Sequence, residues 1–238
     1  DTHLHVIRKI KDGVVENFAG TFESGFNGDG PRESVMLNLP TALLISDDQK
    51  YLNFADSGNN LIRRINIESG EVSTIAGIRG GEELPNVGTA ATASPIGYTA
   101  SLKYDENGNL CFPSTRMVKG ISVEGGIFCI DKSQTIISNT TPATQKFEKA
   151  KDILIGENES YVTELNKLYK FKQDKETEVL TMQSGYGKGL AKLGNTLFVG
   201  NHTLLYAVDE NFNSKIAASG FANISNVKPY HGGLLITD

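Results

Sequence analysis

Residues 39–77, which read LPTALLISDDQKYLNFADSGNNLIRRINIESGEVSTIAG, carry the pattern that decides the fold. Four short apolar segments alternate there with the polar turns DDQK, SGNN and ESG. Short apolar segments bounded by Asn, Asp, Gly and Ser are typical of β-strands that are joined by tight turns. The stretch therefore predicts one antiparallel sheet of four strands.

This unit recurs along the chain. Residues 60–77, NLIRRINIESGEVSTIAG, match residues 5–20, HVIRKIKDGVVENFAG, since both carry an I-R-x-I run, a Gly turn, a Val and a closing Ala-Gly. Residues 94–112, SPIGYTASLKYDENGNLCF, repeat the plan of residues 39–56. Repeated four-stranded units at regular spacing predict an all-β fold, a single β-propeller. The same strand rhythm continues at residues 153–180 and 190–218.

The predicted propeller occupies residues 1–238 as one domain of four-stranded antiparallel blades. The two ends of the chain supply two strands each, and we expect them to pair in one composite blade. This pairing would close the ring and remove its open sheet edges. Five blades are favoured, with six as the alternative. The expected blades span about 39–77, 94–138, 150–184, 188–219, and 224–238 together with 1–20.

The first third of the chain resembles the NHL-repeat family of β-propellers. The resemblance is good over residues 1–95, and after residue 95 the strand rhythm alone continues. It implies a propeller of a kind in which six blades are more usual than five. The residues that carry it are the GFNGDG loop at 25–30 and Pro40, Leu52, Ala55, Asp56, Ser57, Asn59, Asn60, Ile62, Arg63, Ile65, Gly70, Val72, Thr74, Ala76 and Gly77.

The composition limits the classes of function. The chain has 238 residues, with 28 Asp and Glu against 23 Lys and Arg, and a formal net charge of -5. An acidic chain without a basic run disfavours nucleic acid as a partner. No apolar run is long enough for a membrane span, and we expect a monomer. Asn-x-Ser/Thr sequences at 139, 158, 201 and 223 favour an extracellular or cell-surface location.

Cys111 and Cys129 are the two cysteines of the chain. They fall at corresponding positions on two adjacent predicted strands, so we expect them to be neighbours. Two buried thiols that act as small apolar side chains are favoured. A cross-strand disulfide is the alternative.

Loop length indicates where a ligand would bind. The blade-to-blade loops at 21–38, 78–93 and 139–149 are long, as is a loop predicted at 113–126 within one blade. These loops are expected on one face, and long loops tend to carry function. We therefore expect a non-catalytic scaffold that binds a protein or peptide through this face. The candidate ligand-binding residues are Phe26, Asn27, Arg79, Glu82, Arg116, Lys119 and His202.

The Gly-rich loop GFNGDG is expected to be structural. A phosphate-binding loop needs a following helix, and an EF-type calcium loop needs several acidic residues at alternating positions. We expect positive φ at the glycines and hydrogen bonds from loop amides to the carboxylate. A second structural turn is expected around Asp56 and Asn59. The loop residues concerned are Gly25, Gly28, Asp29 and Gly30.

Catalysis in the central channel is the alternative function, in the form of a metal-dependent hydrolase or lyase. No G-x-S-x-G nucleophile elbow is present, and His3, His5, His202 and His231 are not expected to converge on zinc. Gluconolactonase-like propellers hold a divalent ion with Glu, Asn and Asp from inner strands, whereas Asp152 is the main acid of the inner strands expected here. We expect no metal, cofactor or catalytic residue. A carbohydrate-binding propeller is a further alternative, which the absence of Trp disfavours.

Overall fold

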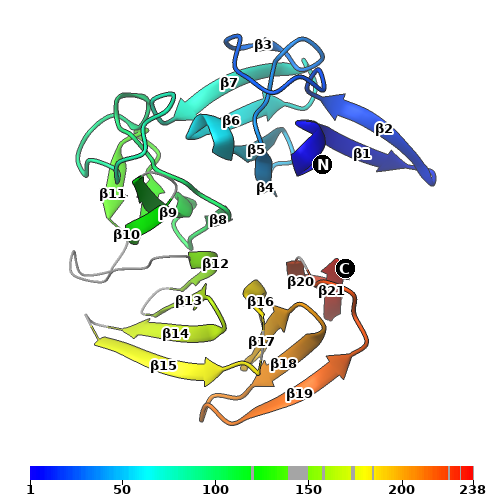
Figure 1. Cartoon of the computed structure of the whole chain (residues 1–238), viewed down its shortest axis with the longest axis vertical. Helices are drawn as coiled ribbons and strands as arrows, with labels where there is room; N and C mark the ends of the chain where they lie inside the picture. Colours follow the sequence, from blue (N-terminus) through cyan, green and yellow to red (C-terminus); the bar gives the residue numbers. More distant parts are fainter. Residues whose placement is uncertain are drawn as a thin grey trace.

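The computed structural model describes residues 1–118, 121–138, 150–156, 159–172, 175–183, 185–224, 226–230 and 232–237. Over these residues the fold is all-β, and helical structure is confined to three short 3-10 turns, η1 (Thr2–Leu4), η2 (Ser57–Asn59) and η3 (Ala91–Ala93). No helix in this part of the chain is long and apolar enough to cross a membrane. Antiparallel sheets stand around a common centre (Figure 1). The predicted all-β propeller fold is confirmed, and the number of blades stays a prediction.

The sheet built from residues 39–77 follows the order of the sequence. Its polar turns are short, and its two middle strands, Tyr51–Asp56 and Leu61–Asn66, bury most of their residues between neighbouring sheets. The strands are β4 (Pro40–Ile45), β5 (Tyr51–Asp56), β6 (Leu61–Asn66) and β7 (Glu71–Ala76), and β3 (Gly30–Pro31) pairs with the outer edge of β7.

Three further sheets have four strands each, again in sequence order from the centre outward. The first contains β8 (Lys103–Tyr104), β9 (Leu110–Val118), β10 (Ile121–Ile130) and β11 (Ile136–Ser138). The second contains β12 (Ala150–Ile155), β13 (Ser160–Glu164), β14 (Lys167–Lys172) and β15 (Lys175–Thr181). The third contains β16 (Gly187–Leu193), β17 (Thr196–Asn201), β18 (Leu204–Val208) and β19 (Ser214–Ser219).

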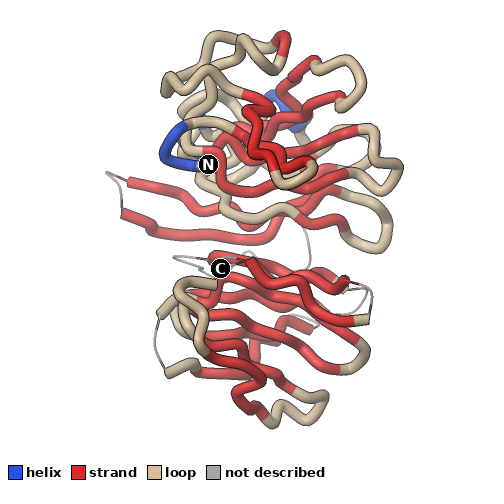
Figure 2. The backbone as a smooth tube through the Cα atoms, turned by 90° about the vertical axis from the view of Figure 1, so that its right-hand side faces the viewer, coloured by secondary structure: helices blue, strands red, loops and turns tan. Residues whose placement is uncertain are grey.

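The expected pairing of the chain ends is not formed. β1 (Ile7–Lys11) and β2 (Val14–Ala19) make one two-stranded sheet, and β20 (Asn226–Tyr230) and β21 (Gly233–Thr237) make another. Both termini lie on the same side of the molecule (Figure 2). However, no ladder joins the two hairpins within the described residues. The β1–β2 hairpin packs its apolar side chains on the β4–β7 sheet. The β20–β21 hairpin packs its apolar side chains on the β16–β19 sheet, so the two hairpins have different neighbours.

Neighbouring sheets pack face to face, and apolar clusters fill the spaces between them. In one such cluster Ile62 and Ala76 of the β4–β7 sheet pack with Ile96 and Phe112 of the next sheet and its approach segment. Because the middle sheets are covered on both faces, their strands bury successive residues rather than alternate ones. β9, for example, is buried continuously over residues 110–115. This explains why the sequence shows short apolar runs instead of strict alternation.

The two I-R-x-I stretches fold alike. Each begins at a left-handed residue that follows a 3-10 turn, His5 with φ 56° and Asn60 with φ 57°. Each ends at a glycine of positive φ, Gly20 with 98° and Gly77 with 100°. A Cβ atom on Gly20 would lie 2.6 Å from the His5 carbonyl oxygen. A Cβ atom on Gly77 would lie 2.3 Å from that of Asn60. Only glycine fits either position, which explains the shared Ala-Gly ending.

The loop that the sequence predicts at 113–126 is not formed by its described residues. Residues 113–118 and 121–126 belong to the long β9–β10 hairpin, whose ladder runs from the pair Val118 and Ile121 to the pair Leu110 and Ile130. The Gly-Gly sequence at 125–126 suggests a turn, but it lies within β10 and pairs with β9. The expected loop in this part of the loop-rich face is therefore replaced by a β-hairpin.

The expectation of two free thiols is also wrong. Cys111 of β9 and Cys129 of β10 are directly opposed in the ladder and form a disulfide. Both side chains are buried. The disulfide links two strands that the hairpin already holds together.

Candidate functional site

The innermost strands of five sheets, β4, β8, β12, β16 and β20, face the centre of the ring (Figure 1). These strands and their flanking residues line a cavity there. Its volume of about 640 Å³ suits a small molecule. We call it the axial cavity. The residues that line it are Thr2, Thr41, Ala42, Leu43, Tyr98, Ala100, Ser101, Leu102, Lys103, Lys151, Asp152, Lys188, Asn226 and Lys228.

Asp152 is the single carboxylate in the described lining of the axial cavity, and it is buried. Its Oδ1 accepts hydrogen bonds from Ser101 Oγ at 2.6 Å and from Ile153 N at 2.9 Å. Its Oδ2 accepts one from Leu190 N at 2.8 Å. Lys103 Nζ lies 3.5 Å from Oδ1. These donors belong to three neighbouring sheets, so Asp152 holds the inner strands in place.

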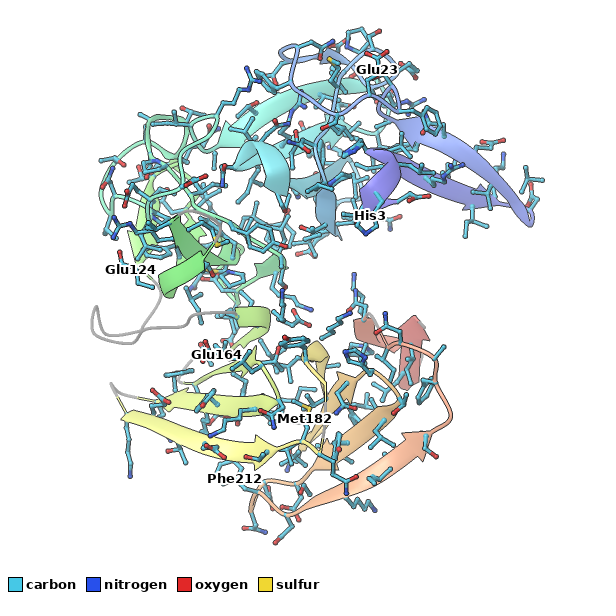
Figure 3. The ribbon with its side chains drawn as sticks, viewed as in Figure 1. His3, Glu23, Glu124, Glu164, Met182 and Phe212 are labelled. Atoms are coloured by element: carbon cyan, nitrogen blue, oxygen red, sulfur yellow. A yellow bond between two sulfur atoms is a disulfide. The ribbon has the colours of Figure 1, made fainter. Side chains whose placement is uncertain are left out.

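Positive charge dominates the rest of the lining. Four successive inner strands contribute one ammonium group each, and Figure 3 shows nitrogen-tipped side chains extending into the central space. We call these four residues the lysine group, which consists of Lys103 on β8, Lys151 on β12, Lys188 on β16 and Lys228 on β20.

Lys188 and Lys151 of the lysine group contact neutral partners. Lys188 Nζ donates a hydrogen bond to Asn223 Oδ1 at 3.3 Å. Lys151 Nζ lies 6.0 Å from the centroid of the Tyr98 ring, the distance of a weak cation–π contact. Lys103 forms an ion pair with Asp152, which is the one carboxylate among the described residues that line the cavity with the four ammonium groups.

Lys228 has an altered acidity. The cavity walls withdraw its side chain partly from water, and this lowers the pKa of its ammonium group from the ordinary value of 10.5. The positive charge of Lys103 lowers the pKa further, while the carboxylate of Asp152 acts in the opposite direction. Lys228 therefore gives up its proton at lower pH than an ordinary lysine.

The axial cavity does not suit a divalent cation. A calcium ion takes about six to eight oxygen ligands, several of them carboxylates. Here Asp152 and the amide of Asn226 stand among ammonium groups, and both oxygens of Asp152 already accept hydrogen bonds. Asp105, Cys111 and Cys129 also bring ligand atoms within 4.8 Å of one another. That group is no metal site either, because both sulfurs belong to the disulfide.

Two of the residues predicted to bind a ligand lie together near the GFNGDG loop. The guanidinium carbon of Arg79 is 5.6 Å from the centroid of the Phe26 ring. Asn27 closes its own loop, since its side chain donates to the carbonyl of Ser34 and accepts from the N–H of Met36, both at 2.8 Å. The visible contacts of Asn27 are thus internal to the loop.

Arg116 and Glu82 meet at the β9–β10 hairpin. Arg116 lies on β9 and forms ion pairs with Glu83 at 2.5 Å and with Glu124 at 3.4 Å. Figure 3 places Glu124 beside this hairpin. The backbone carbonyl of Glu82 accepts a hydrogen bond from Met117 N at 3.3 Å. Arg116 therefore ties the loop after β7 to the hairpin.

His202 and Lys119 complete the set of residues that were predicted to bind a ligand, and His202 is not found beside the other members. His202 lies in the turn between β17 and β18, in another sheet, and its ring centroid is 6.4 Å from that of Tyr186. Lys119 lies outside the described residues. None of the six described members of the set is among the residues that line the axial cavity. A ligand role for the set stays a prediction.

The GFNGDG loop is fastened to the β4–β7 sheet. Asp29 accepts hydrogen bonds from the N–H and the hydroxyl of Thr74, at 2.9 Å and 2.8 Å. Arg63 donates to the carbonyl of Gly28 at 2.7 Å. These contacts close the loop without a ligand. Its glycines have positive φ, with 155° at Gly25, 102° at Gly28 and 149° at Gly30.

Asp56 and Arg63 form a buried ion pair below this loop, with 3.3 Å between Oδ2 and NH1. Asp56 also accepts hydrogen bonds from Asn38 N at 2.6 Å and Asn59 Nδ2 at 2.9 Å. Burial raises the pKa of Asp56, and these hydrogen bonds and the charge of Arg63 oppose that rise. The cluster connects η2, β6 and the loop around residue 38.

Solved structures similar to this chain share its fold. One is described as a gluconolactonase from Xanthomonas campestris, with a TM-score of 0.68 and 11% identity over 100% of this chain and 77% of that one. Another is described as a putative gluconolactonase, with a TM-score of 0.63 and 12% identity over 95% of this chain and 74% of that one. No protein-family model and no curated protein matches the sequence. At these identities the likeness establishes the β-propeller fold.

These findings correct the expected function. The propellers that resemble the chain over nearly its whole length are described as enzymes, which contradicts the expectation of a non-catalytic binding scaffold. The loop-rich face also loses residues 113–126 to a hairpin. The polar groups that do converge lie in the axial cavity. The sequence carried a signal for them, because four of the five expected inner strands contain or directly follow a lysine.

Proposed function

We propose that this chain is a hydrolase that opens a lactone or ester of a small polyol acid in the axial cavity. The observation that carries the proposal is the convergence of Asp152 and the lysine group, including Lys228 with its lowered pKa, in one cavity of about 640 Å³. The description of similar propellers as gluconolactonases supports this substrate class.

The positive charges of the cavity suit the hydrolytic steps. A water molecule bonds to the substrate carbonyl carbon and gives one proton to the surrounding water. The ammonium groups of Lys103 and Lys228 stabilise the negative charge that forms on the carbonyl oxygen. The bond from this carbon to the ring oxygen then breaks, and the leaving alkoxide takes a proton from the surrounding water. Asp152 keeps Lys103 in position through the contact at 3.5 Å.

The test is a pH-stat assay of hydrolysis of D-glucono-1,5-lactone and related lactones, corrected for the rate without protein. Lys228→Met removes one ammonium group of the cavity and keeps the length of the side chain, and we expect kcat/KM to fall by about 100-fold or more. The matched control is Lys215→Met, because Lys215 is an exposed lysine on the outer strand β19. We expect the control to hydrolyse lactones at the wild-type rate.

Two results would contradict the proposal. One is a wild-type protein that hydrolyses none of the lactones faster than buffer. The other is a Lys228→Met protein whose kcat/KM equals that of Lys215→Met.

We also propose that the first 95 residues are NHL-type repeats and that the protein works in an oxidising compartment. The matching left-handed residues and glycines of the two I-R-x-I stretches, His5 with Gly20 and Asn60 with Gly77, support the first point. The disulfide between two buried cysteines supports the second, since disulfides persist mainly outside reducing compartments. Mass spectrometry of the protein purified from its source under alkylating conditions tests the second point, and free thiols would contradict it.

A further inference from the structure

The axial cavity has a charge opposite to that of the whole protein. The chain carries a formal net charge of -5, yet its cavity lining presents four ammonium groups and one carboxylate. Lysines in a solvated position are normally distributed among acidic neighbours. Here they come from four successive inner strands and point to a common space, so the excess positive charge is concentrated where a ligand would lie.

The carboxylate of Asp152 does not balance this charge. It is buried and accepts hydrogen bonds from Ser101 Oγ, Ile153 N and Leu190 N, besides its contact with Lys103. Both of its carboxylate oxygens are thus occupied by donors from three neighbouring sheets. Lys188 and Lys228 form no ion pair with a carboxylate among the residues that line the cavity in the described part of the chain.

The partners of Lys188 and Lys228 leave room for a ligand. Lys188 donates to a neutral amide, Asn223 Oδ1, over a long 3.3 Å. Lys228 is exposed to the cavity and has no ion pair within the described residues. An ammonium group that is partly withdrawn from water gains most from an anionic partner, because charge-assisted hydrogen bonds are strongest there.

We propose that the axial cavity binds a small organic molecule through an oxyanion, a carboxylate or a phosphate, that Lys188 and Lys228 contact together. This inference deepens the proposed function and rests on it, since the anion is taken as part of the substrate that the cavity hydrolyses. The polyol part of such a molecule would face the hydroxyl groups and amide of the lining, Thr41, Tyr98 and Asn226.

Isothermal titration calorimetry of the full chain tests the binding. The probes are potassium gluconate, inorganic phosphate and the neutral polyol sorbitol, each at low and high salt. We expect gluconate or phosphate to bind and sorbitol not to bind, and we expect salt to weaken the binding because the attraction is electrostatic. Binding of gluconate alone identifies a carboxylate site, and binding of phosphate alone identifies a phosphate site. Equal affinity for sorbitol and both anions would overturn the proposal, as would no binding of either anion.

Variants locate the site. Lys188→Met and Lys228→Met should each weaken anion binding by about tenfold, the loss of one charge-assisted hydrogen bond. Lys215→Met, on an outer strand, should bind as the wild type does. If all three variants bind alike, the anion is held elsewhere and the proposal fails. The comparison of anions with sorbitol uses the wild-type protein, so it holds even if a variant folds poorly.

A kinetic comparison separates this inference from the proposed function. D-Glucaro-1,4-lactone carries a carboxylate that D-glucono-1,4-lactone lacks, and we expect kcat/KM to favour the former by about tenfold. Anion binding without hydrolysis of either lactone would reject the proposed function and keep the anion site. Hydrolysis without preference for the anionic lactone, and without anion binding, would keep the proposed function and reject the anion site.

Discussion

Lys103 on β8 and Asp152 on β12 meet in the wall of the axial cavity, with 3.5 Å between Nζ and Oδ1. The same carboxylate accepts hydrogen bonds from Ser101 and from the backbone of Leu190 on β16. One buried side chain thus connects three sheets and one member of the lysine group. Asp152 therefore has a structural and a positioning role, and the lysines are the groups of the cavity that can contact a ligand.

Asp152→Asn should destabilise the fold. An amide has one acceptor oxygen where the carboxylate has two, so at least one of the N–H and O–H groups that now donate to Asp152 would lose its partner. A buried group left without its partner costs about 3 kcal/mol. Urea unfolding followed by circular dichroism measures the change in the free energy of unfolding. The control is Asp47→Asn, because Asp47 is an exposed residue of the β4–β5 turn. Equal stability of the two variants would contradict the role given to Asp152.

The free energy of unfolding should depend on pH in the alkaline range, because of Lys228. The pKa of Lys228 is lower in the folded chain than the ordinary value of 10.5. Between these two pKa values the unfolded chain binds more protons than the folded chain, so the free energy of unfolding rises as pH rises through this window. In Lys228→Met this rise should be smaller than in the wild type or in Lys215→Met. Urea unfolding at several alkaline pH values measures it, and identical pH profiles would refute the assignment.

The ion pair between Arg63 and Asp56 predicts a second large loss of stability. Both side chains are fully buried, and Arg63 also donates to the carbonyls of Gly28 and Met36. Arg63→Met would leave the Asp56 carboxylate buried without its cation, which costs roughly 3 to 5 kcal/mol. Its neighbour Arg64 is half-buried, and its main hydrogen bond is to Asn53 Oδ1 at 2.8 Å.

The comparison with Arg64→Met decides this prediction. Loss of the hydrogen bond from Arg64 should cost about 1 kcal/mol. Thermal and urea unfolding of both variants measure the difference. A variant Arg63→Met that is as stable as Arg64→Met would show that the buried pair does not hold the GFNGDG loop on its sheet.

Glycine substitutions test the structural equivalence of the two I-R-x-I stretches. A Cβ on Gly77 would lie 2.3 Å from a backbone oxygen, whereas Gly88, with φ 84°, has no atom within 4 Å of its Cβ position. Gly88→Ala should therefore cost about 1 kcal/mol for the backbone conformation alone. Gly77→Ala and Gly20→Ala should each cost clearly more, because the backbone must also move. Urea unfolding of the three variants gives the ranking, and a Gly88→Ala variant that is the least stable would contradict it.

Much of the fold could be predicted because its local signals agree. In residues 39–77 the apolar runs, the polar turns and the closing Gly77 all point to the same sheet. The pairing of Gly125 and Gly126 with β9 could not be predicted, because a Gly-Gly sequence favours a turn unless a long partner strand holds it. The separate packing of the two terminal hairpins depends on contacts with neighbouring sheets, which no local pattern reveals.

The site was harder to predict than the fold. Lys103, Lys151, Lys188 and Lys228 are spread over more than half of the chain and are part of 23 Lys and Arg. A lysine on a strand usually belongs to a solvated face, and only the arrangement around the axis shows that these four face one another. The functional prediction relied on long loops instead, since loop length is visible in the sequence. The structural role of Asp152 could not be predicted for the same reason, because Ser101 and Leu190, which donate to it, lie outside its own sheet.

A crystal structure of the protein with gluconate, the product of lactone opening, tests the central claim most directly. We expect the gluconate carboxylate inside the axial cavity, with its oxygens within hydrogen-bond distance of Lys188 Nζ and Lys228 Nζ. Gluconate bound only on the outer loops, or a metal ion coordinated by Asp152 in place of the anion, would contradict the account.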